Sequence, residues 1–263
     1  MSLVTRTLLS ISRLSRQASI LFGYIAASTL TLAEMKDGIR RSWENYCSRD
    51  EEISGGLMDW EKDLVGRFIR PGASVLVVGA GSGRDLIPLA EQGCRLTGVE
   101  PAAAALARAR RAFNDRHLPV TLVEGFFEDA LVDGVFDVIV FSFYSYSYVP
   151  ESRRRVAALR KASAHLAANG RVLISYPAMR PPRPILVRVG RIVGGLFGSD
   201  WRLEPGDVIN VEGGAFFSFS HAFEPGELDA EAVAAGLSVI YRRDYPDPVR
   251  ALAASTSASS PQS

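Results

Sequence analysis

The stretch Val75-Leu-Val-Val-Gly79-Ala-Gly81-Ser-Gly83-Arg84-Asp85 decides the fold. Its apolar run is typical of a strand that is buried on both faces in a parallel sheet. Glycines at alternating positions follow, and a helix is predicted to begin at Asp85. Glycine has no Cβ atom, so it allows a sharp turn and lets a ligand approach the backbone. The first N–H groups of the helix have no partner within it and are available to that ligand.

A carboxylate stands at the matching place one strand later. Arg95–Val99 is predicted to be the second strand, and Glu100 follows it directly. A carboxylate at the end of the second strand is suited to accept hydrogen bonds from both hydroxyls of a ribose. The glycine turn and Glu100 together predict a site for an adenosine-containing ligand.

The middle of the chain alternates between predicted strands and helices. Strands are predicted at Ser74–Val78, Arg95–Val99, Val120–Glu124, Phe136–Ser142 and Arg171–Tyr176, and helices at Asp85–Gln92, Ala102–Asn114 and Ser152–Ala168. Such alternation indicates right-handed βαβ units and an α/β fold with a doubly wound parallel sheet.

The last third departs from this alternation. Residues 178–210 are rich in Pro, Gly and Arg, which indicates an insertion. A strand at Ala215–Phe223, a helix at Pro225–Gly236 and a strand at Ser238–Arg243 are predicted after it. Residues 251–263 are small and polar, and we expect them to fray.

Composition excludes several classes of protein. The chain has 263 residues, which suits one large α/β domain, and its 47% apolar and 22% charged residues are ordinary for a soluble globular protein. Thirty basic residues against 29 acidic ones give a net charge of +1, so no nucleic-acid partner is expected. The cysteines, Cys47 and Cys94, provide neither a disulfide framework nor a zinc site, which predicts a reducing cytoplasm. The three histidines lie far apart in the sequence, so no metal is expected.

Gly79-x-Gly81-x-Gly83 resembles the first motif of the class I S-adenosylmethionine-dependent methyltransferases. The dinucleotide fingerprint has a glycine where this chain has Arg84. The resemblance covers roughly Leu64 to Arg250. It implies a seven-stranded, mostly parallel sheet whose last strand is antiparallel. It also implies a helical lid at residues 1–64, a methyltransferase domain at 65–250 with an insertion at 178–212 between the fifth and sixth strands, and a disordered tail at 251–263.

The resemblance also implies which residues contact S-adenosylmethionine. Glu100-Pro101 resembles the family's ribose-binding acid, and Phe126 stands where the family usually has an Asp for adenine. Adenine would then be held by backbone groups near Phe127 and by aromatic packing. Tyr46 is either a core residue or part of a lid over the cofactor. The predicted cofactor contacts are Gly79, Ala80, Gly81, Ser82, Gly83, Asp85, Glu100, Pro101, Phe126, Phe127, Phe141, Ser142 and Tyr46.

The acceptor of the methyl group is less visible in the sequence than the cofactor. Methyl transfer from a sulfonium has a neutral leaving group, so the protein mainly supplies alignment and exclusion of water. A base is needed only when the acceptor must lose a proton. Tyr144, in the tyrosine run after the fourth strand, is the predicted acceptor contact, and His221 is the predicted base. Alternatively, the tyrosines of this run form a face that packs against the lid. His221 is alternatively a structural histidine.

Two segments mix arginine with apolar residues. Arg6, Arg13 and Arg16 fall within an arc of roughly 80° on a helix, opposite to Val4 and Leu8. This pattern predicts an amphipathic helix that packs on the domain or lies on an anionic membrane. Residues 183–197 have the same mixture, and we expect the insertion to cover the acceptor pocket.

The predicted function is a cytoplasmic methyltransferase for a small-molecule acceptor. The expected location is the cytoplasm, either free or peripheral to a membrane. One alternative is a methyltransferase that acts on a lipid or amphiphile at a membrane surface. Another is a non-catalytic, nucleotide-binding scaffold of the same fold. The oligomeric state is not predicted.

Overall fold

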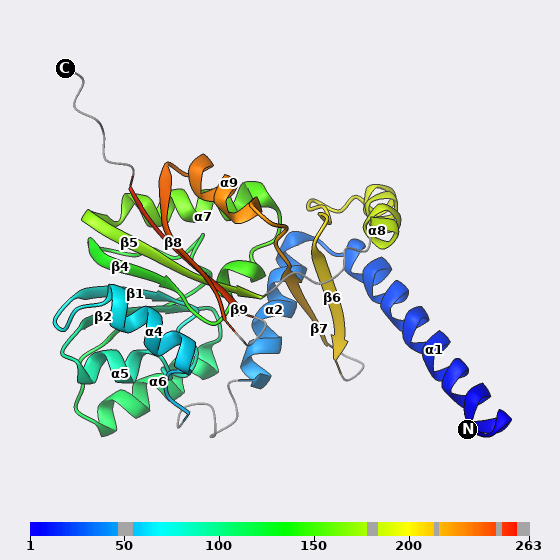
Figure 1. The fold of residues 1–263 in the computed structure, drawn as a ribbon, viewed down its shortest axis with the longest axis horizontal. Coiled ribbons are helices and arrows are strands. Elements are labelled where there is room, and N and C mark those ends of the chain that lie inside the picture. The colour runs from blue at the N-terminus through cyan, green and yellow to red at the C-terminus, as the bar shows by residue number, and fades with distance from the viewer. Residues whose placement is uncertain (47–54, 178–183, 213–215, 246–248, 257–263) are drawn as a thin grey trace, which may run out of the picture.

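A computed structural model describes residues 1–46, 55–177, 184–212, 216–245 and 249–256. Seven strands form a central sheet, and a two-stranded sheet stands beside it (Figure 1). The order across the central sheet is β3 (Thr121–Glu124), β2 (Arg95–Glu100), β1 (Ser74–Val78), β4 (Phe136–Phe141), β5 (Leu166–Pro177), β9 (Val249–Thr256) and β8 (Leu237–Asp244). Strands β3 to β5 pair in parallel, whereas β9 is antiparallel to both β5 and β8. The predicted doubly wound, mostly parallel sheet of seven strands with an antiparallel last strand is confirmed.

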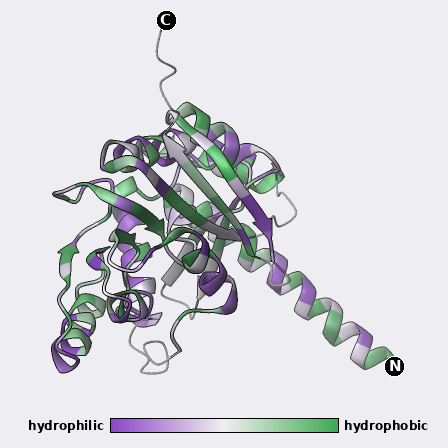
Figure 2. Cartoon of the chain, turned by 60° about the vertical axis from the view of Figure 1, so that its left-hand side comes forward, coloured by the Kyte–Doolittle hydropathy of each residue, from purple (hydrophilic) through white to green (hydrophobic). Residues whose placement is uncertain are grey.

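Helices cover both faces of this sheet (Figure 1). One face carries α4 (Asp59–Phe68), α5 (Leu86–Glu91) and α6 (Ala103–Asp115), and the other carries α7 (Ser152–Ala164) and α9 (Glu227–Ala234). Successive residues of β1 point to opposite faces: Leu76 and Val78 belong to the core with α7 and α9, and Val75 and Val77 to the core with α5 and α6. Two buried faces are the reason for the continuous apolar run in β1, and the sheet is correspondingly hydrophobic in Figure 2.

The position of the last strand corrects the expectation of a disordered tail. Residues 249–256 form β9, and Ala251, Leu252, Ala253 and Ala254 are all fully buried between β5 and β8. Small side chains gave this segment no strong apolar pattern, yet they fit a strand that is covered on both faces. The rest of the predicted tail, residues 257–263, lies outside the described residues.

The predicted sixth strand is also corrected. Residues 216–221 form β7 (Phe216–His221), which pairs with β6 (Asp207–Glu212) in the separate small sheet. Helix α7 ends at Ala164, earlier than predicted, because β5 begins at Leu166, which pairs with Phe136 of β4. Tertiary pairing therefore overrides the helical pattern of this stretch.

An accessory unit is formed by α1 (Leu3–Ser28), α2 (Leu32–Tyr46), α8 (Pro184–Phe197), β6 and β7. These elements share a core of their own, which includes Tyr24, Met35, Val187, Trp201 and Phe219. The first turns of α1 project away from the rest of the molecule (Figure 1). In the part of the chain that is described, no helix is long and apolar enough to cross a membrane. The predicted insertion thus packs with the N-terminal helices; its residues 178–183 lie outside the described ranges.

Candidate active site

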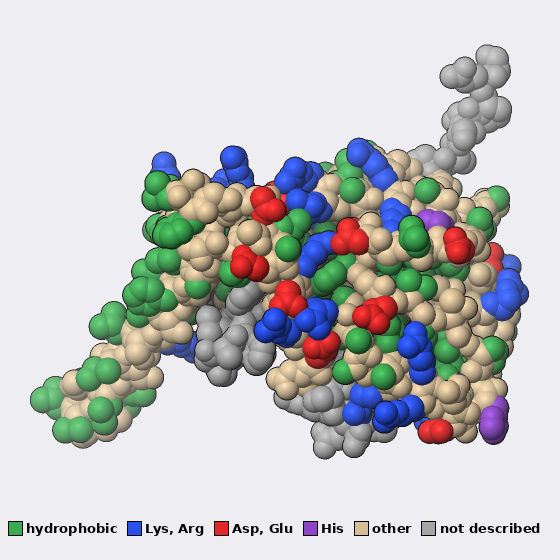
Figure 3. Space-filling model, turned by 180° about the vertical axis from the view of Figure 1, so that it is seen from behind, with side chains coloured by type: hydrophobic (Ala, Val, Ile, Leu, Met, Phe, Trp, Pro, Cys, Tyr) green, Lys and Arg blue, Asp and Glu red, His purple; other side chains and the backbone are tan. Residues whose placement is uncertain are grey.

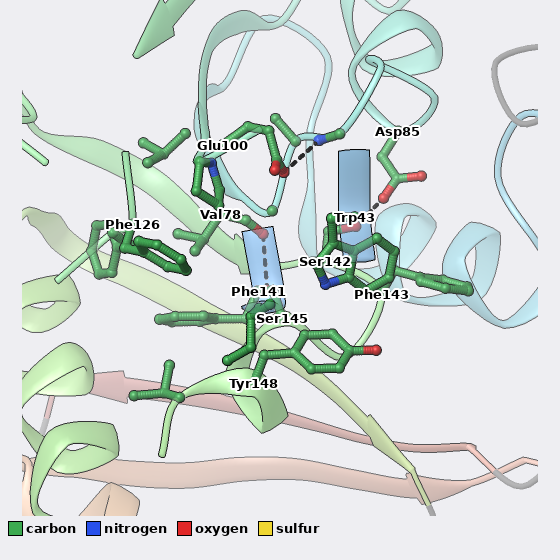
Figure 4. A pocket seen from close by; sticks show the side chains of 18 of the residues that line it. Trp43, Val78, Asp85, Glu100, Phe126, Phe141, Ser142, Phe143, Ser145 and Tyr148 are labelled. Carbon is green, nitrogen blue, oxygen red and sulfur yellow. Dashed lines mark hydrogen bonds between the residues drawn. The ribbon is translucent and has the colours of Figure 1, made fainter. Parts of the chain in front are cut away.

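A cavity of about 290 Å³ lies at the carboxyl ends of β1, β2 and β4 (Figure 4). Its walls are the glycine turn after β1, the end of β2, residues 125–128 after β3 and residues 141–150 after β4. Helix α2 closes another side through Lys36, Ile39, Trp43 and Tyr46. Open α/β sheets bind their ligands at this edge, where the strands end.

The glycine turn lets two parts of the chain come close together. Gly79 has a φ of +78°, and a Cβ atom on it would lie 2.7 Å from the Cβ of Ser145, in the segment after β4. Gly83 has a φ of +95°, and a Cβ there would lie 3.3 Å from the ring of Phe113 in α6. Gly79 therefore shapes the cavity, whereas Gly83 serves the packing of α6.

The Glu100 carboxylate is held at the cavity wall by backbone groups. The N–H of Gly81 donates to Oε2 and the N–H of Ala102 donates to Oε1, both at 3.0 Å. The side chain of Glu100 is 5% exposed and faces the cavity (Figure 4). A buried carboxylate in a fixed orientation fits the paired hydroxyls of a ribose.

A second acidic group lies next to the turn. Arg84 stands between two buried carboxylates, 2.5 Å from Glu61 Oε1 and 2.6 Å from Asp85 Oδ1. Asp85 Oδ2 accepts a hydrogen bond from the Ser142 hydroxyl, and Oδ1 is the oxygen paired with Arg84. Burial raises the pKa of Asp85, and burial together with the charge of Asp85 raises the pKa of Glu61 to about 7. Asp85 is thus a buried carboxylate at the cavity wall, held in place by Arg84 and Ser142.

Aromatic rings from two segments close the cavity. The ring of Trp43 lies 5.1 Å from that of Tyr148 and 6.2 Å from that of Phe143, and Tyr46 stacks on Phe143 at 6.3 Å. We call Trp43, Tyr46, Phe143 and Tyr148 the aromatic wall. The opposite end of α2 is fixed by Lys36, which lies 3.3 Å from Glu128, 2.8 Å from Asp129 and over the ring of Phe126. Helix α2 is therefore a cover anchored to the segments after β3 and β4.

Most of the predicted cofactor contacts come together here. Every one of them lines the cavity except Ser82, which is fully buried, and Gly83. Lys36, Trp43 and Tyr148 also line the cavity but are not among the contacts predicted from the sequence. The spacing of Lys36, Ile39, Trp43 and Tyr46 at helical intervals was the available signal, since it places them on one face of α2.

The two predicted catalytic residues do not line the cavity. Tyr144 has a φ of +66°, and its ring is stacked on Trp60, with centroids 6.4 Å apart. His221 is fully buried in the accessory unit, with Nδ1 2.7 Å from Asp207 and Nε2 2.8 Å from Glu227. Burial alone would lower the pKa of His221, but the bonds to these carboxylates raise it to about 9. A protonated ring with both nitrogens engaged is poorly suited to act as a base on a substrate in the cavity.

The insertion does not cover the cavity either. None of the described residues of 184–212 belongs to its lining. Helix α8 packs on the end of α1 instead, where a Cβ on Gly190 would lie 2.5 Å from Ser28 Oγ. The cover comes from α2 and from the aromatic residues after β4.

Comparison with known proteins identifies the domain. Residues 75–170 match a family model described as a methyltransferase domain, and they contain the glycine turn, Glu100 and the segments after β3 and β4. Residues 75–170 form a methyltransferase domain. The methyltransferase resemblance predicted from the sequence is confirmed for this domain.

One curated relative of the methyltransferase domain is the cypemycin N-terminal methyltransferase of a Streptomyces species. It is 31% identical over 123 residues, which are 41% of this chain and 49% of the relative. The chain thus spans about half the length of the curated relative that it matches.

Solved structures share the fold of the methyltransferase domain. The CcbJ methyltransferase of Streptomyces caelestis has a TM-score of 0.57 and 20% identity, over 78% of this chain and 92% of that one. CalS10 of Micromonospora echinaspora, an amino pentose methyltransferase solved with S-adenosylmethionine bound, has a TM-score of 0.54 and 20% identity, over 74% and 89%. At this identity the likeness shows the fold alone.

Proposed function

We propose that this chain is a methyltransferase that transfers the methyl group of S-adenosylmethionine to an amine on a small molecule or peptide. The observation that carries the proposal is the cavity in which the glycine turn, the oriented Glu100 carboxylate and the Asp85 carboxylate meet. The cypemycin enzyme is named for an N-terminal acceptor and CalS10 for an amino sugar, which supports nitrogen as the accepting atom. A small-molecule or peptide acceptor agrees with both.

Each part of the wall has a task in holding the cofactor. Glu100 accepts hydrogen bonds from the ribose hydroxyls, and Phe126 and Phe127 pack against adenine. The Asp85 carboxylate lies on the side of the cavity for the ammonium group of the methionine part, where its negative charge is favourable. When bound, S-adenosylmethionine supplies an electrophilic methyl group on a sulfonium, and the departing thioether is neutral.

The aromatic wall positions the acceptor. Trp43, Phe143 and Tyr148 surround the open side of the cavity, and their faces attract a cationic amine and exclude water. The bound ammonium loses one proton to solvent, and the lone pair of the resulting neutral amine attacks the methyl group. The site therefore needs no dedicated base, which agrees with the location of His221 outside the cavity. The proton released from the methylated amine passes to solvent.

Calorimetry followed by an acceptor screen tests this function. In calorimetry, we expect the chain to bind S-adenosylmethionine and S-adenosylhomocysteine but not NAD. In the screen, we expect it to transfer the labelled methyl group of S-adenosylmethionine to amines and peptide N-termini. Binding of NAD alone would overturn the cofactor assignment. Labelling confined to hydroxyl acceptors would overturn the choice of nitrogen and leave the cofactor site intact.

Contact with a membrane is a separate proposal. The residues that would make it lie on α1 and α8, outside the cavity, so it does not depend on the acceptor. The peripheral location expected from the sequence depends on this contact. A lipid or amphiphile as the acceptor depends on it as well.

A further inference from the structure

Two helices far apart in the sequence expose apolar side chains along one edge of the accessory unit. Each of these side chains is at least 58% exposed. We call them the α1–α8 face, which consists of Leu3, Val4, Leu8, Ile11, Leu14 and Phe22 of α1 and Ile185, Ile192 and Leu196 of α8. Figure 3 shows hydrophobic side chains along the outer edge of both helices.

The apolar residues of each helix lie opposite the side that packs on the protein. At 100° per residue, the exposed apolar residues of α1 span an arc of roughly 140°. Gly23, Tyr24 and Ala27, which are buried, lie outside that arc. In α8, Gly190 and Gly194 are buried against Ser28, and the exposed apolar residues are on the other side. This close contact packs α8 against the end of α1, and the exposed apolar residues of both helices lie along the same outer edge of the accessory unit (Figure 3).

The surroundings of this surface are basic. Arg6, Arg13, Arg16 and Arg188 are exposed and form no ion pair with any described residue. No acidic residue occurs before Glu34 or between Glu151 and Asp200 in the sequence. Basic side chains also stand next to the apolar edge over α8 in Figure 3.

We propose that the α1–α8 face lies on the surface of an anionic phospholipid bilayer. An amphipathic helix with an apolar arc and arginines on its polar side binds in the plane of the interface. Each arginine near an anionic leaflet adds to the attraction. The structure favours this occupant over a second copy of the chain, because a twofold pairing of this face would set arginine near arginine with no acid on either helix.

Vesicle co-sedimentation with the full chain tests the proposal. The vesicles are phosphatidylcholine alone or phosphatidylcholine with about a third phosphatidylglycerol, at low and at high salt. We expect binding to the anionic vesicles only, and weaker binding at high salt because the charges are screened. The triple variant Leu8→Ser, Ile11→Ser and Leu14→Ser should reduce that binding about tenfold or more, because it removes apolar area from the face.

A matched control separates the face from exposed apolar residues in general. Leu131 and Val233 are 90% and 67% exposed and lie outside the face, so the double variant Leu131→Ser and Val233→Ser should bind as the original chain does. The melting temperatures of both variants are measured as well. Values equal to that of the original chain would show that the variants fold. Vesicle binding needs neither cofactor nor acceptor, so its failure is distinct from failure of the proposed function.

Three results would overturn the proposal. One is no binding of the original chain to anionic vesicles, and another is equal binding by the triple variant. The third is a dimer in solution that the triple variant converts to a monomer without any vesicle binding, since a second copy would then occupy the face.

Discussion

Replacing Glu100 by glutamine should weaken S-adenosylhomocysteine binding while the fold survives. The Glu100 carboxylate accepts from two backbone N–H groups, of Gly81 and Ala102, one at each oxygen. An amide has a single oxygen acceptor, so its NH₂ group would face one of these donors. The variant therefore loses the negative charge and also the fixed orientation of the side chain.

The size of the effect follows from the hydrogen bonds to the ribose. A bond to a charged acceptor contributes about 1.5–3 kcal/mol, and one to a neutral acceptor about 0.5–1.5 kcal/mol. Two bonds, each weakened by about 1.5 kcal/mol, give a loss of about 3 kcal/mol in binding free energy. This corresponds to an increase in Kd of about 150-fold, which isothermal titration calorimetry resolves.

Glu124→Gln is the matched control. Glu124 is the parallel neighbour of Glu100 at the end of β3, but it is exposed and does not line the cavity. Its variant should bind with the original affinity. If Glu100→Gln also bound S-adenosylhomocysteine with the original Kd, the ribose would not lie against Glu100, and the reasoning that places the cofactor would be refuted.

Three other changes test separate parts of the structure. Gly79→Ala should lower the free energy of unfolding by about 2 kcal/mol and weaken S-adenosylhomocysteine binding, because the new Cβ would meet Ser145 and the φ of Gly79 is +78°. The control Gly66→Ala, on α4, adds a Cβ in open space and should not lower the free energy of unfolding. Chemical denaturation measures both variants. The folded-state pKa of His221 is raised from 6.5 to about 9, so protonation of this ring stabilises the folded protein. Its contribution to the free energy of unfolding is complete below about pH 6.5 and is lost as the pH rises to about 9. The free energy of unfolding should fall by about 3 kcal/mol across that window, and His221→Gln should abolish this fall. Trp43→Ala should raise the KM for an amine acceptor about tenfold in a steady-state assay, because the variant loses one cation–π contact. An unchanged KM would exclude Trp43 from acceptor binding.

The parts of the site that could be predicted are those with a local physical cause. The apolar run of β1, the turn that needs glycine at Gly79 and the acid after β2 each depend on a few consecutive residues. Their spacing along the chain carries over directly into space, because parallel strands end at one edge of the sheet. The part of the cavity wall formed by residues 79–81, 100–101 and 126–127 was therefore predictable from the sequence.

Other residues received their roles from contacts that are distant in sequence. Trp43 lines the cavity because Lys36 anchors α2 to Glu128 and Asp129. Tyr144 is turned away by a positive φ that nothing in the tyrosine run indicates. His221 was predicted to be the base, but β7 pairs with β6 in the small sheet, and the ring is buried between the carboxylates of Asp207 and Glu227.

The sequence by itself determined the class of fold, the glycine turn and the carboxylate at the end of β2, because backbone conformation and hydrophobic period are properties of short segments. Only the tertiary structure decided that Ala251–Ala254 form a central strand, that α2 covers the cavity and that α8 lies beside α1. Small residues such as those of β9 carry little hydrophobic signal of their own. Their burial is set by the strands and helices that surround them, and those neighbours come together only when the whole chain folds.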